Sequence, residues 1–136
     1  PPPIEMLPSN SDTREVPDAD SIEEPMRKFI TEHLGGFDAI IGGDHTGAIA
    51  IRLLHELNMR IPGDVAVIGG GTTILAGYCE VPLTSVNAEN DVAGEMAFGL
   101  LMDRMNGRIN GGYRRLINPA KLFVRQSTQD QKVSAT

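Results

Sequence analysis

The chain has 136 residues, which suits one compact domain and is too short for two of ordinary size. Hydrophobic residues make up 40% of it and charged residues 22%, proportions of a globular chain and not of a disordered one. Eighteen acidic and 12 basic side chains give a formal net charge of −6, which argues against a chain built to grip phosphate backbones. The single Cys79 excludes an intramolecular disulfide. No apolar run is long enough to span a bilayer, and no signal-peptide pattern opens the sequence.

The first part of the chain is rich in turn formers. Residues 1–20 contain five prolines, which predicts an extended or loop segment. The capping-box pattern Ser21-Ile22-Glu23-Glu24 predicts that a helix begins there, with Pro25 in its first turn. Gly35-Gly36 marks the predicted end of this helix.

Two short apolar runs predict buried strands. Phe37–Ile41 is followed by Gly42-Gly43, and Val65–Ile68 is followed by a run of three glycines. Between the two runs the apolar residues recur at helical spacing, so a helix is expected there, with Asp44 placed to cap its start. The apolar positions of that helix are Ala48, Ile51, Leu54 and Leu57.

The second half continues the alternation of strands and helices. Residues 72–79 predict a short helix or loop, residues 82–86 a strand, and residues 122–124 a last short strand. A long helix is expected between these strands, with one apolar side and with Gly107 just past its end. Its apolar positions are Val92, Ala93, Met96, Ala97, Leu100, Leu101 and Met105. Such an order predicts an α/β fold with a largely parallel sheet flanked by helices.

The glycines that follow the predicted strands are candidate ligand contacts. In open α/β sheets, ligands bind at the carboxyl ends of the strands. Asp44 stands at such an end, where it either contacts a ligand hydroxyl or only caps the helix, and capping is the commoner role. Gly69-Gly70-Gly71 begins like a dinucleotide-binding turn, but Ile74 replaces the third glycine of that fingerprint. Arg114-Arg115 is interpreted as a solvated basic pair, not as a phosphate clamp.

The titratable residues give little support to catalysis or metal binding. His33, His45 and His55 are the only histidines, and none has a metal ligand at short spacing. Cys79 could be combined with His45 and Asp44 into a nucleophilic triad, but no nucleophile elbow or oxyanion turn accompanies it. We therefore expect no enzyme activity, no cofactor and no metal site.

Five segments resemble, in order and spacing, landmarks of the carboxyl-terminal half of the LacI/GalR family of transcription regulators. They are Phe37–Asp44, Leu57–Gly69, Val81–Val86, the helix positions Gly94, Ala97 and Leu101, and Leu122–Thr128. Together they extend over about two thirds of the chain.

The resemblance implies a periplasmic-binding-protein-like core with two α/β lobes and a ligand cleft between them. Residues 21–128 would form an incomplete carboxyl-terminal lobe, which includes the segment that crosses to the other lobe, and residues 129–136 a flexible tail. The family's helix-turn-helix is expected to be absent from this chain, as are nearly all of the first lobe and the opening strand and helix of the second. Operator DNA would then be bound only through that missing amino-terminal domain, in a cytoplasmic protein with no membrane contact.

By position in the family, the effector would meet Gly43, Asp44, Gly71 and Ala88. The family usually has an aromatic residue and an acid where this chain has Gly70 and Gly71, and often a polar residue where it has Ala88. Loss of such groups changes polar-ligand recognition. The effector is therefore left open between a sugar and a nucleobase-like molecule, with a vestigial pocket as the remaining alternative.

The resemblance also implies a homodimer whose interface comes from two segments of this lobe. The candidate interface residues are Ala48, Ile51, Arg52, His55, Ile74, Tyr78 and Cys79. Two other functions stay open at this point. One is a periplasmic-type solute-binding protein of transport, and the other is a small α/β enzyme that uses the glycine turn or Cys79.

Overall fold

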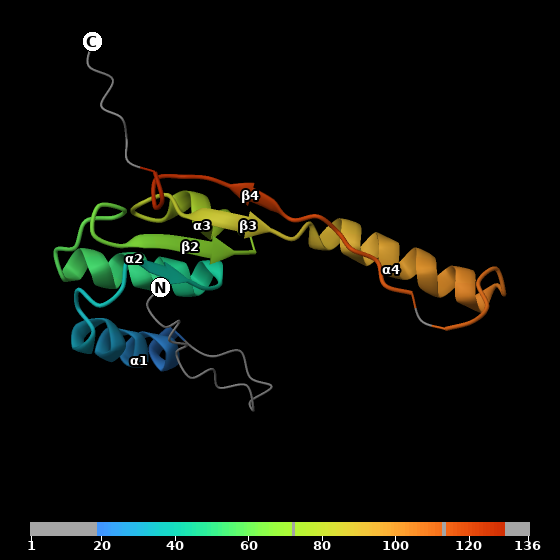
Figure 1. Cartoon of the computed structure of the whole chain (residues 1–136), viewed down its shortest axis with the longest axis horizontal. Coiled ribbons are helices and arrows are strands. Elements are labelled where there is room, and N and C mark those ends of the chain that lie inside the picture. The colour runs from blue at the N-terminus through green and yellow to red at the C-terminus, as the bar shows by residue number, and fades with distance from the viewer. Residues whose placement is uncertain (1–18, 72, 113, 130–136) are drawn as a thin grey trace, which may run out of the picture.

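The computed structural model describes residues 19–71, 73–112 and 114–129, which form four helices and four strands (Figure 1). The helices are α1 (Ala19–Glu32), α2 (Asp44–Glu56), α3 (Ile74–Tyr78) and α4 (Asn90–Met105). The strands are β1 (Ala39–Ile41), β2 (Ala66–Gly70), β3 (Thr84–Asn87) and β4 (Lys121–Phe123). Within the described part of the chain, no helix has the length and hydropathy that a membrane crossing requires.

The four strands form one sheet in the order β1-β2-β3-β4. β1 pairs with β2, and β2 with β3, in parallel, whereas β3 and β4 run antiparallel. The parallel pairs are joined through helices, because strands that run in the same direction need a crossover connection. The predicted α/β fold with a largely parallel sheet is therefore confirmed.

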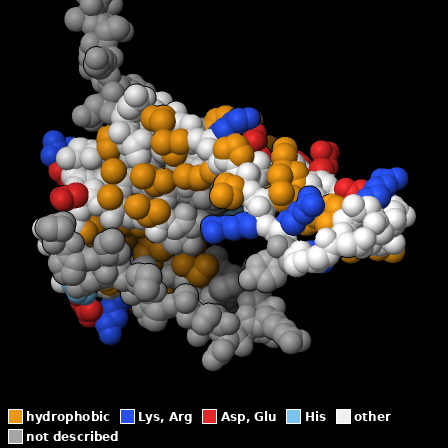
Figure 2. Space-filling model, turned by 45° about the vertical axis from the view of Figure 1, so that its right-hand side comes forward, with side chains coloured by type: hydrophobic (Ala, Val, Ile, Leu, Met, Phe, Trp, Pro, Cys, Tyr) orange, Lys and Arg blue, Asp and Glu red, His pale blue; other side chains and the backbone are white. Residues whose placement is uncertain are grey.

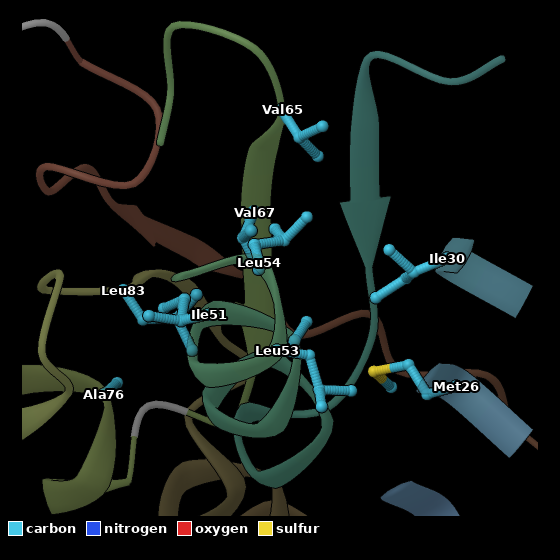
Figure 3. Packing of buried hydrophobic residues seen from close by; sticks show 10 residues of the cluster. Met26, Ile30, Ile51, Leu53, Leu54, Val65, Val67, Ala76 and Leu83 are labelled. Atoms are coloured by element: carbon cyan, nitrogen blue, oxygen red, sulfur yellow. The ribbon is translucent and has the colours of Figure 1, made fainter. Parts of the chain in front are cut away.

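The hydrophobic core lies between the sheet and α2 (Figure 3). Alternate residues of β2 point towards α2, so that Val67 is fully buried against Leu54, while α1 contributes Met26 and Ile30 from the far side of α2. The buried hydrophobic residues are Met26, Ile30, Ala50, Ile51, Leu53, Leu54, Val65, Val67, Ala76 and Leu83. This packing fixes the positions of α2, β2 and β3 relative to one another.

The opposite face of the sheet is not covered by any described helix (Figure 1). Apolar side chains lie open on it: Ile41 is 75% exposed and Leu122 is 57% exposed. Val86, which pairs with Leu122, is 37% exposed. An uncovered apolar face of this kind favours association with other protein surface.

α1 begins earlier than predicted. It starts at Ala19, so that Pro25 lies in the middle of the helix and not in its first turn. Proline there removes one backbone donor from the helix. Tertiary contacts compensate, because Met26 and Ile30 in the turn that follows are fully buried. The remaining predicted loop, residues 1–18, lies outside the described residues, as do residues 130–136 of the predicted tail.

Four charged side chains join α1 to α2. Arg27 bonds Glu23 at 3.1 Å and Glu56 at 2.8 Å, and Arg52 bonds Glu56 at 2.8 Å and also Glu23. Each cation therefore bridges both carboxylates. Hydrogen bonds from Arg52 and Arg27 lower the pKa of Glu23, and the same two cations lower the pKa of Glu56. The alternating charges hold α1 in register on α2.

α4 differs from the other helices in having no buried residue. It projects away from the sheet and forms an arm with the segment that returns to β4 (Figure 1). Phe98, Leu101 and Met105 are 65%, 54% and 71% exposed. The prediction of a helix with one apolar side was wrong here, because apolar residues lie on every side of α4: Ala93, Met96 and Leu100 are half-buried on one side, whereas the three residues above are exposed. A helix that is apolar on every side is typical of a buried position.

Candidate effector-binding site

The carboxyl ends of the three parallel strands meet at one edge of the sheet. The Gly42 N–H donates to the Ile68 carbonyl at 3.0 Å, and the Gly71 N–H donates to the Val86 carbonyl at 2.9 Å. These bonds extend the strand pairing past the ends of β1 and β2. They bring the predicted contacts Gly43, Gly71 and Ala88 to the same edge, which we call the rim. β2 itself continues to Gly70, two residues further than the glycine run predicted.

Asp44 does not cap α2, so that prediction was wrong. The N-cap residue is Gly43, with extended backbone angles and no side-chain cap hydrogen bond, and Asp44 is the first helical residue. Its side chain turns into the protein and is 2% exposed. There Oδ1 accepts a hydrogen bond from the Ser85 hydroxyl at 2.6 Å, and Oδ2 accepts one from the Thr73 backbone N–H at 2.5 Å.

The buried Asp44 carboxylate is held in its charged form. Burial alone would raise the pKa of Asp44, but the hydrogen bonds from Ser85 and Thr73, together with the positive charge of Arg125, bring it below its usual value. One carboxylate thus joins the start of α2, the turn after β2 and the middle of β3. Asp44 therefore stabilises the rim through hydrogen bonds made inside the protein.

Gly69 provides the space for this carboxylate. A Cβ atom at residue 69 would overlap Asp44 Oδ1 and lie 2.7 Å from Leu83 Cδ2. Glycine is therefore required there by packing. At Gly70, by contrast, a Cβ would lie 3.6 Å from its nearest neighbour, the Gly42 carbonyl oxygen.

The surface of the rim has almost no side chains. Gly43, Gly71 and Ala88 are all exposed. A Cβ at residue 43 would meet nothing closer than the Gly70 carbonyl oxygen at 4.0 Å, whereas Gly71 has a φ of +119°, which favours glycine. The rim can therefore offer a ligand backbone groups and van der Waals contact, but no charged side chain from these three positions.

The chain leaves the rim through a turn held by polar bonds that sequence reasoning missed. Glu89, the N-cap residue of α4, has a φ of +48°, and the Asn87 side chain accepts a hydrogen bond from the Glu89 N–H at 2.9 Å. Asn118 donates to the carbonyls of Ala88 at 2.8 Å and Glu89 at 3.1 Å, and Lys121 pairs with Glu89 at 2.5 Å. These bonds join the turn between β3 and α4 to the segment that enters β4. Because Asn118 lies thirty residues from Ala88, the local sequence gave no sign of this contact.

The candidate dimer residues fall into three groups. Ile74 and Tyr78 point outwards from α3 and are 81% and 82% exposed. Arg52 and His55 are exposed on α2, but Arg52 already bonds Glu23 and Glu56, while His55 Nδ1 lies 2.7 Å from Glu80. The remaining three are less accessible. Ile51 is 1% exposed and belongs to the core, and Ala48 and Cys79 are half-buried.

Cys79 is not prepared for nucleophilic chemistry. Burial, together with the negative charge of Asp44, raises the pKa of its thiol. The thiol donates to the Leu75 carbonyl at 3.1 Å. A protonated thiol is a poor nucleophile. Among residues 19–71, 73–112 and 114–129, no group of three or more His, Cys, Asp or Glu side chains could hold a metal ion.

Comparison with known proteins matches residues 8–128 to the periplasmic binding protein-like domain family. The chain is 36% identical over 91 residues to the HTH-type transcriptional regulator CelR of Thermobifida fusca, and 35% identical over 98 residues to the lactose operon repressor of Rhizobium radiobacter. These matches take in 66% and 71% of this chain. The chain belongs to the LacI/GalR family of transcription regulators.

Solved LacI-type structures agree with this membership. A CelR–cellobiose complex has a TM-score of 0.72 and 34% identity over 80% of this chain and 33% of its own. A LacI family regulator from Arthrobacter sp. FB24 in complex with lactose has a TM-score of 0.71 and 26% identity, over 82% of this chain and 41% of its own. The predicted periplasmic-binding-protein-like fold is thus confirmed, and the relatives are named as regulators, not enzymes.

The chain spans only part of most of these relatives. It aligns with 26% of CelR, although with 85% of the Rhizobium radiobacter repressor sequence. It also aligns with 30% of the purine repressor PurR of Edwardsiella ictaluri. The activity of a whole regulator can therefore only be proposed for this chain.

Proposed function

We propose that this chain forms one wall of the effector cleft of a LacI-type transcription regulator and supplies a surface for its dimerisation. The observation that carries the proposal is the rim, where Gly43, Gly71 and Ala88 meet at the carboxyl ends of three parallel strands. Ligands of open α/β sheets bind at such ends. The fold around this rim is the one that the CelR–cellobiose complex shares.

The exposed apolar surface of α4 supports the same function. Nothing in the described chain covers Phe98, Leu101 or Met105. A second lobe packed on this arm would bury them and would close over the rim from the other side. Effector-driven closure of two lobes would then alter the affinity of the whole regulator for operator DNA. A cytoplasmic location accords with that role.

A sugar is the effector class we propose, because two structural relatives are complexes with cellobiose and with lactose. Both ligands are disaccharides. The three rim positions carry no side chain larger than a methyl group, which leaves room for such a ligand but provides no polar side chain on this wall. Hydrogen bonds to sugar hydroxyls would come from backbone groups here and from side chains of the opposite lobe.

Titration of the ¹⁵N-labelled chain with cellobiose and with lactose tests this assignment. We expect the amide signals of Gly43, Gly71 and Ala88 to shift together and to saturate. Gly43→Val should abolish these shifts, because the valine side chain would project from the rim into the space that the sugar is proposed to occupy. Gly99→Val, at an equally open position on α4, is the matched control and should leave them unchanged. Shifts confined to other residues, or none with either sugar and with a purine base, would contradict the proposal.

Dimerisation is proposed through α3. Replacing Ile74 and Tyr78 by serine is expected to weaken self-association by at least about tenfold in sedimentation equilibrium, because both large side chains are more than four-fifths exposed and neither supports the fold. The control is the serine double variant of Ile41 and Leu122, on the uncovered sheet face. If only this control dissociates the chain, the interface lies on the sheet and not on α3.

A further inference from the structure

The net charge of −6 conceals a strong separation of charge along the chain. Residues 1–103 contain 17 carboxylates and five Lys or Arg side chains. Residues 104–129 contain six Lys or Arg side chains and no carboxylate. The acidic part of the chain, residues 1–103, is therefore followed by a basic segment, residues 104–129.

Four of these cations gather at the far end of the arm. Arg104 lies in the last turn of α4, and Arg108, Arg114 and Arg115 follow in the segment that leads back towards β4. We call this region, residues 104–112 with 114 and 115, the arm tip. Figure 1 places it at the end of the molecule furthest from α1 and α2, and Figure 2 shows basic side chains along the arm beside apolar ones.

The cations of the arm tip are accessible. All four arginines are exposed. Arg108 pairs with Asp103 at 3.2 Å and Arg104 donates to the Gly112 carbonyl at 2.7 Å, whereas no described residue forms an ion pair with Arg114 or Arg115. The arm tip therefore keeps a net positive charge even after Asp103 is counted.

The backbone of the arm tip also allows close approach. A Cβ atom added to Gly107, Gly111 or Gly112 would meet nothing within 4 Å, so each of these glycines borders open space. Gly107 and Gly111 adopt φ values of +69° and +114°. A glycine turn between arginines lets a partner approach the backbone closely as it contacts the guanidinium groups. Guanidinium forks match phosphate oxygens in pairs.

The length of α4 separates the arm tip from the acidic lobe. Sixteen helical residues extend for about 24 Å. The Debye length is about 8 Å at physiological ionic strength, so the lobe's negative charge is largely screened at the arm tip. A polyanion can thus meet the arginines without strong repulsion from the rest of the chain.

We propose that the arm tip binds the phosphate backbone of double-stranded DNA without sequence preference. The polyanion is taken to be DNA because curated relatives of this chain are named as regulators of the helix-turn-helix type, which places such proteins at DNA. In a whole regulator the arm tip would add nonspecific contacts to those of the DNA-binding domain. This proposal does not depend on which effector the rim takes.

Fluorescence anisotropy of a labelled duplex of arbitrary sequence tests the proposal, with the 136-residue chain titrated at several salt concentrations between about 50 and 200 mM. Four phosphate contacts predict that log K falls with log salt concentration with a slope of about −3 to −4. The Arg114→Gln/Arg115→Gln double variant should reduce the magnitude of this slope by about 2. Lys28→Gln/Arg60→Gln, which removes two exposed cations outside the arm, should bind as the original chain does.

Three results would overturn the proposal. One is the absence of salt-dependent binding at the lowest salt concentration. Another is an equal loss of affinity in the Lys28/Arg60 control, which would mean that overall charge and not the arm tip determines binding. The third is tighter binding to poly-glutamate than to a duplex of equal charge, which would assign the arm tip to an acidic protein surface. Circular dichroism melts of both variants verify that each remains folded.

Discussion

Replacing Asp44 by alanine is expected to lower the free energy of unfolding by about 3 kcal/mol. The carboxylate is buried and accepts hydrogen bonds from the Ser85 hydroxyl and the Thr73 N–H. Its removal leaves both donors without this acceptor and opens a small cavity under the rim. Urea denaturation followed by circular dichroism measures the change.

The same carboxylate predicts a pH dependence. Because the pKa of Asp44 is lowered in the folded protein, its stabilising contribution is complete above the unfolded value of about 4 and is lost as the pH falls through the folded value. Asp44→Asn keeps an oxygen for Ser85 but sets an amide against the Thr73 N–H. The free energy of unfolding of Asp44→Asn should therefore lie between those of the original chain and of Asp44→Ala. It should also fall less than that of the original chain between about pH 5 and pH 3. If Asp44→Ala unfolds at the same urea concentration as the original chain, the carboxylate does not support the rim.

Gly69→Ala is expected to destabilise the chain by about 2 kcal/mol, whereas the adjacent Gly70→Ala is expected to change its stability little. The added methyl group at residue 69 would overlap Asp44 Oδ1 and press against Leu83, both of which are buried. At residue 70 the methyl group would be in ordinary contact with the Gly42 carbonyl oxygen. There it also reduces the freedom of the unfolded chain.

Thermal melts of the two variants side by side provide this test, since the chemical change is the same and only the surroundings differ. Equal melting temperatures for Gly69→Ala and Gly70→Ala would show that the space beside Asp44 is not a constraint on the sequence. A loss of stability in Gly70→Ala alone would show that the strand end, and not the Asp44 junction, is the tightly packed part of the rim.

The strands and helices themselves could largely be predicted from local pattern. The apolar runs before Gly42 and Gly69 correspond to β1 and β2, and the apolar-rich stretch after residue 90 corresponds to α4. Boundaries were less well predicted. α1 extends to Ala19 past the capping-box pattern, because burial of Met26 and Ile30 compensates for a proline inside the helix.

The role of Asp44 could not be predicted, because its partners are distant in sequence. Thr73 is 29 residues away and Ser85 is 41 residues away, and only the parallel pairing of β2 with β3 brings them to the start of α2. A local pattern therefore predicted a helix cap. The positions of Gly43, Gly71 and Ala88 on one rim were predicted through the family resemblance. Their contact with an effector stays a prediction.

The exposure of α4 has a similar cause. Its sequence is apolar enough for a buried helix, but the returning segment covers only part of it: Ala93, Met96 and Leu100 are half-buried, whereas Phe98, Leu101 and Met105 are exposed. Sequence periodicity cannot distinguish a helix packed on its own sheet from one that packs on another lobe. Sequence periodicity likewise could not predict that the sheet face around Ile41 is exposed.

The reading frame upstream of the codon for Pro1 is the most direct test of the account, whose central claim is that this lobe works within a DNA-binding regulator. Sequencing of that DNA is predicted to show a helix-turn-helix of about sixty residues followed by a first lobe of domain size, in frame with Pro1. A signal peptide ahead of such a lobe would contradict the account and make the protein a transport receptor.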